Sequence, residues 1–269
     1  MKRMLIAMQF LSVIPVWVSG DLSAKEIGES SIFFPAVGAM QGFLLLASGL
    51  LLMTIFPPDI TAAFIVTLMI IFNGGFHLDG LADTFDALAV KSSGDAAADR
   101  KKRLAVMKDS ATGAIGVVAV VMVLLLKYVL IKNLLAFAIP FAALLALSLM
   151  PVFSKWVMVP AMYLGKPARE EGLGALFINE TSLRCLVVAS MLTLFLFGIV
   201  SGFYLTALYG MKGLLINLAL PAGYLISYAT AGECERVFGG LTGDTLGALG
   251  ELSEIFYLTG VYIWVQHFI

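Results

Sequence analysis

The sequence predicts an all-α, polytopic integral membrane helical bundle. Hydrophobic residues make up 60% of the 269 positions and charged residues only 13%, whereas an ordinary soluble domain has roughly 25% charged residues. Long apolar runs recur along the chain, and the mean hydropathy is +0.98. Together these observations indicate a chain that is embedded in membrane lipid over most of its length.

About seven apolar runs are expected to be transmembrane helices, because most are long enough to cross about 30 Å of hydrocarbon. The apolar stretch that begins after Arg3 and ends at Val18 is short for a span and lacks a small-residue cleavage site. We therefore expect an interfacial or re-entrant segment there, and a single integral membrane domain over 1–269. The seven runs lie at 31–56, 60–82, 112–131, 134–163, 184–208, 213–232 and 245–266.

Three long connections carry most of the charge. If the basic loop 91–111 is cytoplasmic, as the positive-inside rule indicates, alternation places the other two, 165–183 and 233–244, on the same side. The acidic residues follow this division, with Asp59 alone on the opposite side. The positive-inside rule does not explain an acidic bias, so we expect a functional site on the cytoplasmic face.

Four basic residues fall outside that division. Lys127, Lys132 and Lys212 are expected to face the opposite side of the membrane. Lys155 lies within an apolar run, and its amine is expected either to snorkel to the lipid headgroups or to reach an anionic substrate, with snorkelling favoured.

Composition excludes several classes of function. A net charge of −1 gives no basic field for nucleic acid. Cys185 and Cys234 follow no spacing motif and predict buried thiols rather than a disulfide or a thiolate metal site. His77 and His267 are too far apart to indicate a zinc site.

The stretch 73–88 turns abruptly from apolar to acidic. Offsets of 0, 4 and 7 place Asp79, Asp83 and Asp86 on one stripe of a helix. Like charges so close repel one another, and a bound cation removes that cost. Oxygen ligands beside three glycines suit Mg²⁺ or Mn²⁺ better than zinc. The alternative is a solvated acidic helix end, which usually interleaves Lys or Arg. The glycines are Gly74, Gly75 and Gly80.

Three further polar segments fall on the same predicted face, each with a structural alternative. In 107–113, the candidates are Lys108, Asp109 and Ser110, and a helix N-cap is the alternative. In 168–174, Arg169 could grip a phosphate, or form an ion pair within a surface loop.

In 239–247, glycines and hydroxyls beside a helix N-terminus suit a phosphate cradle formed by Thr242, Gly243 and Asp244. Simple capping of the last helix is the alternative.

His77 is a candidate general base or a structural, hydrogen-bonded histidine. Carboxylates, glycine-rich turns and basic side chains on one face indicate metal-assisted phosphoryl transfer.

The motifs resemble those of the cobalamin synthase family, adenosylcobinamide-GDP ribazoletransferase. The match covers residues 8–258 and four ordered motifs. These are G-G-F-H-L-D-G-L-A-D-T-F-D at 74–86, M-K-D-S at 107–110, A-R-E-E-G-L-G at 168–174, and G-G-L-T-G-D-T-L-G-A at 239–248 followed by E-L-S-E at 251–254.

The resemblance implies a multi-pass enzyme of the bacterial inner membrane with its active site facing the cytoplasm. It would join adenosylcobinamide-GDP to α-ribazole or its 5′-phosphate with Mg²⁺, releasing GMP in the last assembly step of cobalamin biosynthesis. It also implies that Asp79, Asp83 and Asp86 hold the metal, and that Asp244 completes the site. Homo-oligomerisation is left open. The chain departs from the family pattern at Ala87, Ala111 and Lys155. Ala111 stands where the family commonly has an arginine, so a phosphate contact at position 111 is in doubt.

Two other functions are considered. The D-G-x-x-A pattern also occurs in CDP-alcohol phosphotransferases, but Asp83 stands where their motif has arginine and their downstream aspartates are not matched. A cation-coupled secondary transporter would place ionisable groups near the membrane midplane, whereas the carboxylates here are predicted at one face, with Lys155 as the only deep charge.

Overall fold

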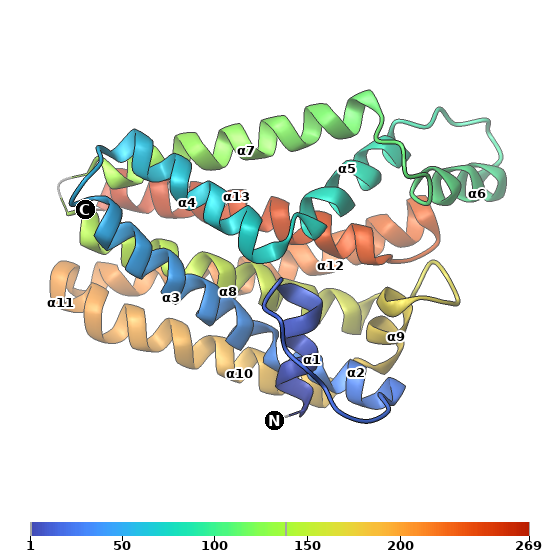
Figure 1. Cartoon of the computed structure of the whole chain (residues 1–269), viewed down its shortest axis with the longest axis horizontal. Coiled ribbons are helices and arrows are strands. Elements are labelled where there is room, and N and C mark those ends of the chain that lie inside the picture. The colour runs from blue at the N-terminus through green and yellow to red at the C-terminus, as the bar shows by residue number, and fades with distance from the viewer. Residues whose placement is uncertain (1, 138, 269) are drawn as a thin grey trace.

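The computed structural model describes residues 2–137 and 139–268, and these residues form helices and short connections without a named strand. Long helices lie side by side along the longest axis of the molecule (Figure 1). The elements are α1 Lys2–Leu11, α2 Ala24–Ser30, η1 Ser31–Phe33, α3 Phe34–Leu52, α4 Pro58–Asn73, α5 Phe76–Leu88, α6 Ala96–Val106, α7 Ala114–Leu135, α8 Pro140–Leu164, α9 Leu173–Glu180, α10 Leu183–Ile199, η2 Val200–Leu205, α11 Thr206–Tyr209, η3 Gly210–Leu218, α12 Ala219–Phe238 and α13 Gly243–Phe268.

Helix α8 is the central element of the bundle. Its residues are buried almost without interruption from Ala142 to Met162, and α3, α10, α12 and α13 all pack against it. The α3 backbone comes closest, because Gly38 and Gly42 face the α8 main chain directly. Small residues at such contacts let membrane helices approach closely and gain packing energy.

The outer faces of the surrounding helices are apolar. Phe43 on α3 is 72% exposed and Phe195 on α10 is 64% exposed. Soluble monomers rarely expose large continuous apolar areas, so these faces are suited to contact lipid. Further exposed apolar side chains of this kind are Leu51, Phe64, Val117, Val118, Val121, Leu194, Phe203 and Leu225.

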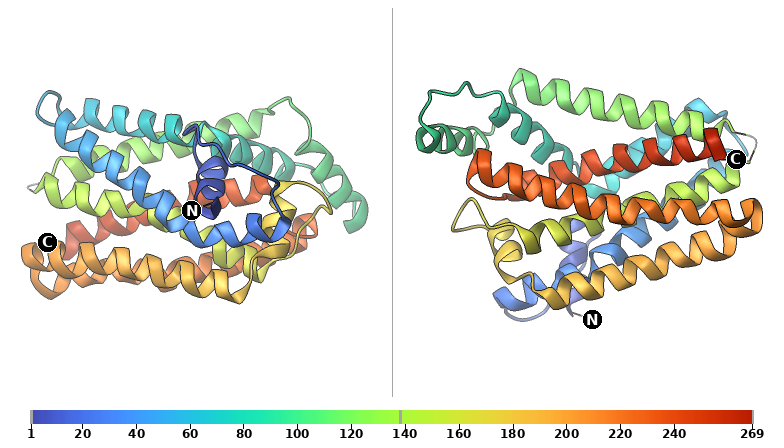
Figure 2. Two further views of the ribbon diagram at one scale, coloured as in Figure 1. Left: turned by 60° about the horizontal axis from the view of Figure 1, so that its bottom comes forward. Right: turned by 180° about the vertical axis from the view of Figure 1, so that it is seen from behind.

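Four helical segments of the described chain are long and apolar enough to cross a membrane, or five if α4 and α5 count as one broken span. This number of spans is lower than the seven predicted from the apolar runs for two reasons. The segment Leu183–Phe238 is continuous over 56 residues, although α10 and α12 within it lie antiparallel in Figure 2. Helix α13 carries three carboxylates and is not among the four segments. The all-α membrane architecture itself is confirmed.

The three long connections lie at one end of the bundle (Figure 1). The first contains α6 and the second contains α9. Two of them are bonded to each other, because the Ala168 N–H donates to the Leu241 carbonyl at 2.8 Å and the Leu241 N–H donates to that of Lys166 at 2.7 Å. Arg103 on α6 donates from Nη1 to the Val237 carbonyl at 3.2 Å. The sequence prediction that these connections share one end is therefore confirmed.

The N-terminal helix α1 lies across the long helices rather than along them (Figure 1). Its ten residues are too few to cross a bilayer. Ile6, Ala7 and Leu11 are buried against the bundle. The short, non-spanning segment expected from the sequence is thus observed.

Candidate active site

The acidic helix α5 begins at a sharp break in the chain. Helix α4 ends at Asn73 and α5 starts at Phe76. The two helix axes differ by 88°. Gly74 has φ +63° and Gly75 φ +74°. Residues with a Cβ rarely adopt such angles, so the glycine pair permits the turn. The Gly75 N–H donates to the Ile70 carbonyl at 3.2 Å, which closes the end of α4.

The three aspartates of α5 lie in different surroundings. Asp79 is exposed, whereas Asp83 and Asp86 are partly buried. No hydrogen bond or ion pair in the described chain involves the carboxylate of Asp79 or Asp83. Those two carboxylates are therefore free to bind a cation or a substrate.

Helix α13 packs directly against α5 through glycines. A Cβ at Gly80 would lie 2.8 Å from the Cα of Asp244, and a Cβ at Gly247 would lie 3.1 Å from the Cα of His77. Contacts so short leave no room for a larger side chain. The consequence is that Asp244, far away in the sequence, is held beside the acidic stripe of α5.

The carboxylates act on one another electrostatically, since Asp83 experiences the negative charges of Asp79, Asp86 and Asp244. Among the described residues, Arg169 is the one cation that forms an ion pair with this group. Its Nη1 lies 3.6 Å from Asp244 Oδ2. Burial raises the pKa of the Asp244 carboxyl, while Arg169 opposes that rise. The site therefore carries an excess of negative charge that a divalent cation would offset.

Asp86 has a structural partner that sequence analysis did not predict. Its Oδ2 accepts from the Gly113 N–H at 2.6 Å and its Oδ1 from the Gly116 N–H at 2.8 Å. These donors belong to the first turn of α7, so Asp86 caps that helix from α5. The N-cap expected from Asp109 or Ser110 is therefore supplied by another helix.

The glycine-rich turn before α13 is closed by its own hydroxyls. The Thr245 N–H donates to Thr242 Oγ1 at 3.1 Å, and the Thr242 N–H donates to Thr245 Oγ1 at 2.8 Å. Thr242 is buried, whereas Gly243 is exposed. Capping by Thr242, the structural alternative, is thus observed, and a phosphate cradle here would rest on Gly243 and Asp244.

Lys108, Asp109 and Ser110 are exposed and stay within their own turn. Asp109 Oδ1 accepts from the Ala111 N–H at 3.1 Å. None of the three contacts the carboxylate cluster within the described ranges. The neighbouring Met107 contacts the turn before α13, since its sulfur accepts from Thr242 Oγ1 at 3.9 Å.

His77 is buried and pairs with a lysine. Its Nδ1 lies 3.1 Å from Nζ of Lys155, which is completely buried in α8. The prediction that Lys155 snorkels to the headgroups is therefore wrong. The structural alternative for His77, a histidine held by a hydrogen bond, is observed.

A second buried charge cluster lies deeper in the bundle. Lys127 Nζ contacts Glu251 Oε2 at 2.5 Å and Glu254 Oε2 at 2.6 Å, and Ser154 Oγ donates to Glu254 Oε1 at 2.9 Å. The expectations that Lys127 faces outward and that Lys155 is the only deep charge are wrong. A lysine in the middle of an apolar run was the available signal, because such a charge needs a buried partner.

The described residues contain no group of three or more His, Cys, Asp or Glu side chains placed to hold a metal ion. The predicted metal set of Asp79, Asp83, Asp86 and Asp244 therefore stays a prediction. Asp79, Asp83 and Asp244 fit a hard cation by their chemistry, because oxygen ligands suit Mg²⁺ and the first two have no protein partner. Asp86 is already occupied by the two N–H groups of α7.

Replacing Asp86 should destabilise the fold as well as alter the site. In Asp86→Ala, two N–H groups of α7 lose their acceptor, and we expect the free energy of unfolding to fall by about 1–2 kcal/mol. Asp79→Ala, which removes no hydrogen bond, is the matched control. The check is the thermal unfolding midpoint of each variant in detergent, and equal midpoints for Asp86→Ala and wild type would refute the capping role.

Replacing Lys127 should be more costly. Lys127→Met leaves two glutamates buried without their cation, a change that typically costs about 3–5 kcal/mol. Adding Glu251→Gln and Glu254→Gln should recover part of the loss, whereas Lys132→Met, an exposed residue of the same helix, should have little effect. If Lys127→Met unfolds like Lys132→Met in the same thermal assay, the cluster is not a stabilising ion pair.

Comparison with known proteins identifies relatives of this chain. The sequence profile of the cobalamin-5-phosphate synthase family matches residues 3–262. A protein from Thermodesulfovibrio yellowstonii, named adenosylcobinamide-GDP ribazoletransferase, is 36% identical over 99% of both chains. Proteins with the same name from Geotalea daltonii and Desulfitobacterium hafniense are 35% identical over 94% of both chains and 34% identical over 97% of both chains.

No solved structure matches this chain. The sequence relationship nevertheless covers nearly the whole length of each relative, including the acidic helix α5 and the turn before α13 that meet at the site. The chain therefore belongs to the cobalamin-5-phosphate synthase family.

Proposed function

We propose that this protein is an Mg²⁺-dependent adenosylcobinamide-GDP ribazoletransferase. It joins adenosylcobinamide-GDP to α-ribazole or α-ribazole 5′-phosphate and releases GMP. The relatives carry the name of this transferase. The observation that carries the proposal is the contact of α5 with α13, because it holds Asp79 and Asp83 beside Asp244 and Arg169.

In the proposed reaction, a ribose hydroxyl of α-ribazole attacks the phosphorus that is attached to the cobinamide side chain. A new O–P bond forms, the bond to the bridging oxygen of the diphosphate breaks, and GMP leaves with that oxygen. The hydroxyl proton passes to solvent. Little covalent chemistry is required of the protein, so its side chains act by positioning and electrostatics.

Asp79, Asp83 and Asp244 would hold the metal. Bound Mg²⁺ would supply charge neutralisation for the diphosphate and the departing phosphate. Arg169 is the candidate to bind a phosphate oxygen, because its Nη1 lies 3.6 Å from Asp244 Oδ2 at the carboxylate cluster. A guanidinium donates to phosphate with two parallel N–H groups, and Mn²⁺ suits the same oxygen ligands.

His77 contributes a hydrogen bond rather than a base in this scheme. Two buried glutamates carry two negative charges and Lys127 supplies one positive charge. A protonated Lys155 would supply the second positive charge. That ammonium would donate to His77 Nδ1, which lies 3.1 Å from Lys155 Nζ, and the neutral imidazole would then carry its proton on Nε2. His77 Nε2–H is then a donor that can orient the substrate.

The family relationship also favours this function over the alternatives. A CDP-alcohol phosphotransferase would share the D-G-x-x-A pattern but not a match over residues 3–262. A transporter would use its deep charges to bind a moving ion, whereas Lys127, Glu251 and Glu254 are bonded to one another.

The activity is tested by GMP release from adenosylcobinamide-GDP and α-ribazole by the full chain in liposomes. Release should require Mg²⁺ and stop with EDTA. Asp79→Asn and Asp83→Asn should each lower the rate by roughly 100-fold or more, with no change in thermal stability. Asp59→Asn, at the opposite end of the bundle, is the control. An inactive wild type would refute the proposed function, and a fully active Asp79→Asn variant would refute the proposed site.

We further propose that the site faces the cytoplasm of a bacterial inner membrane. The end that carries the site also carries the basic helix α6, with Arg100, Lys101, Lys102 and Arg103. Positively charged segments are retained on the cytoplasmic side of a membrane.

This orientation predicts which cysteines an impermeant maleimide reaches. Lys102→Cys and Glu170→Cys, both exposed at the site end, should be labelled in inverted inner-membrane vesicles but not in intact spheroplasts. Thr54→Cys, at the opposite end, should show the reverse pattern. Labelling of Lys102→Cys in intact spheroplasts would contradict the proposed orientation.

A further inference from the structure

A cavity of about 480 Å³ opens directly beside the carboxylates. His77, Asp79 and Asp244 line it, and apart from Gln9 the other side chains of its wall are apolar. Small-molecule sites typically occupy roughly 300–1,000 Å³ and combine apolar walls with a few polar groups that converge at one point. The cavity thus has the size and polarity of a binding site for part of a substrate.

Aromatic side chains form the apolar wall. Phe10 of α1 and Phe177 of α9 both line the cavity, and their ring centroids lie 4.3 Å apart. Phe34 stacks on Phe10, with ring centroids 5.9 Å apart, but does not line the cavity. Phe76, the first residue of α5, adds a third aromatic side chain to the lining. Phe177 is only 1% exposed, so a planar aromatic ligand would stack on Phe10 and Phe76.

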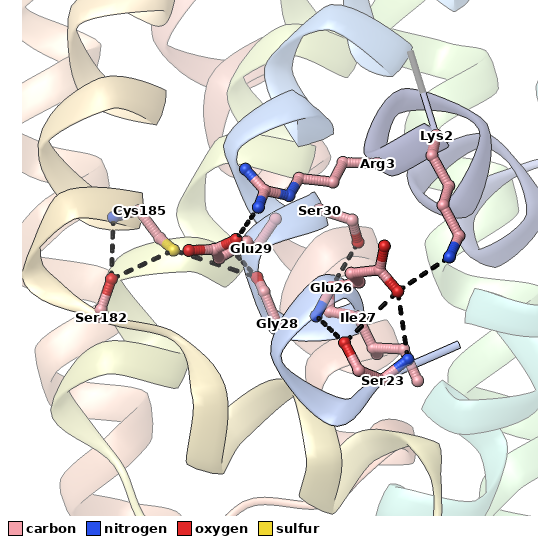
Figure 3. Close-up of polar contacts among 11 residues, drawn as sticks. Lys2, Arg3, Ser23, Glu26, Ile27, Gly28, Glu29, Ser30, Ser182 and Cys185 are labelled. Atoms are coloured by element: carbon pink, nitrogen blue, oxygen red, sulfur yellow. Dashed lines mark hydrogen bonds and ion pairs between the residues drawn. The ribbon is translucent and has the colours of Figure 1, made fainter. Parts of the chain in front are cut away.

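The short N-terminal helices are fixed in position to make this wall (Figure 3). Lys2 Nζ pairs with Glu26 Oε2 at 2.9 Å, and Arg3 pairs with Glu29. Ser23 and Glu26 form a capping box that starts α2. These bonds tie α1 to α2, so the helix that does not span the membrane serves as one side of the cavity.

We infer that this cavity binds the nucleoside substrate, with its aromatic base against Phe10 and Phe76 and its ribose toward Asp79 and Asp244. The inference rests on the proposed function. It places the attacking hydroxyl beside the carboxylates that would hold the metal and, through it, the diphosphate.

The chemistry of the wall distinguishes the nucleoside from the other substrate groups. The base of α-ribazole is a benzimidazole with few polar atoms, whereas the edge of guanine carries several donors and acceptors. An apolar wall would leave those guanine groups unpaired, which is costly. A corrin ring with its amide side chains is far larger than the cavity. Of the three groups, the benzimidazole nucleoside fits best.

The kinetic test compares two phenylalanines that line the cavity with one that does not. Phe10→Leu and Phe76→Leu should each raise KM for α-ribazole by roughly tenfold, because each removes a stacking ring. KM for adenosylcobinamide-GDP should stay within about twofold of wild type. Phe34→Leu, which packs against Phe10 outside the cavity, should leave both KM values unchanged. A rise in KM for adenosylcobinamide-GDP instead would overturn the assignment.

A binding test separates this inference from the proposed reaction. Leu22 lines the cavity and is 43% exposed, while both native cysteines are buried. Maleimide labelling of Leu22→Cys should slow at saturating α-ribazole, and labelling of Trp17→Cys, which lies outside the cavity, should not. Protection without turnover would support the cavity and refute the function. Equal labelling with and without α-ribazole, in an enzyme that releases GMP, would refute the cavity alone.

Discussion

The close contact between α5 and α13 is the constraint on which the site depends. Because Gly80 and Gly247 have no side chains, the two backbones meet, and Asp244 lies beside a stripe of carboxylates from a helix more than 150 residues earlier. Repulsion among these carboxylates opposes the contact. The packing of α13 against α5 and the central helix α8 must therefore outweigh that repulsion, and a cation would reduce it.

The remaining charges are arranged to hold the site in place. Both carboxylate oxygens of Asp86 accept hydrogen bonds from α7, which fixes the C-terminal part of α5. Deeper in the bundle, Lys127 joins α7 to α13 through two glutamates, and Lys155 joins α8 to α5 through His77. Buried ion pairs gain little net stability but are costly to break, so they serve to fix the register of the helices around the site.

Sequence analysis predicted the helical membrane fold, the clustering of the long connections at one end and the acidic stripe, because these follow from hydropathy and helical periodicity. It could not predict partners that depend on tertiary contacts. Asp86 shows the same spacing as its neighbours, yet it caps another helix. Lys127 was expected outside the membrane because its partners, Glu251 and Glu254, lie more than 120 residues away. The cavity could not be predicted either, since its walls come from six separate segments.

The central proposal is that Asp79, Asp83 and Asp244 share a divalent cation between α5 and the start of α13. Anomalous scattering from Mn²⁺, in a crystal of the full chain with adenosylcobinamide-GDP, would test it most directly. A manganese peak within about 2–3 Å of carboxylate oxygens of these residues is the expected result. A peak held only by the substrate phosphates, or by carboxylates elsewhere in the chain, would contradict the account.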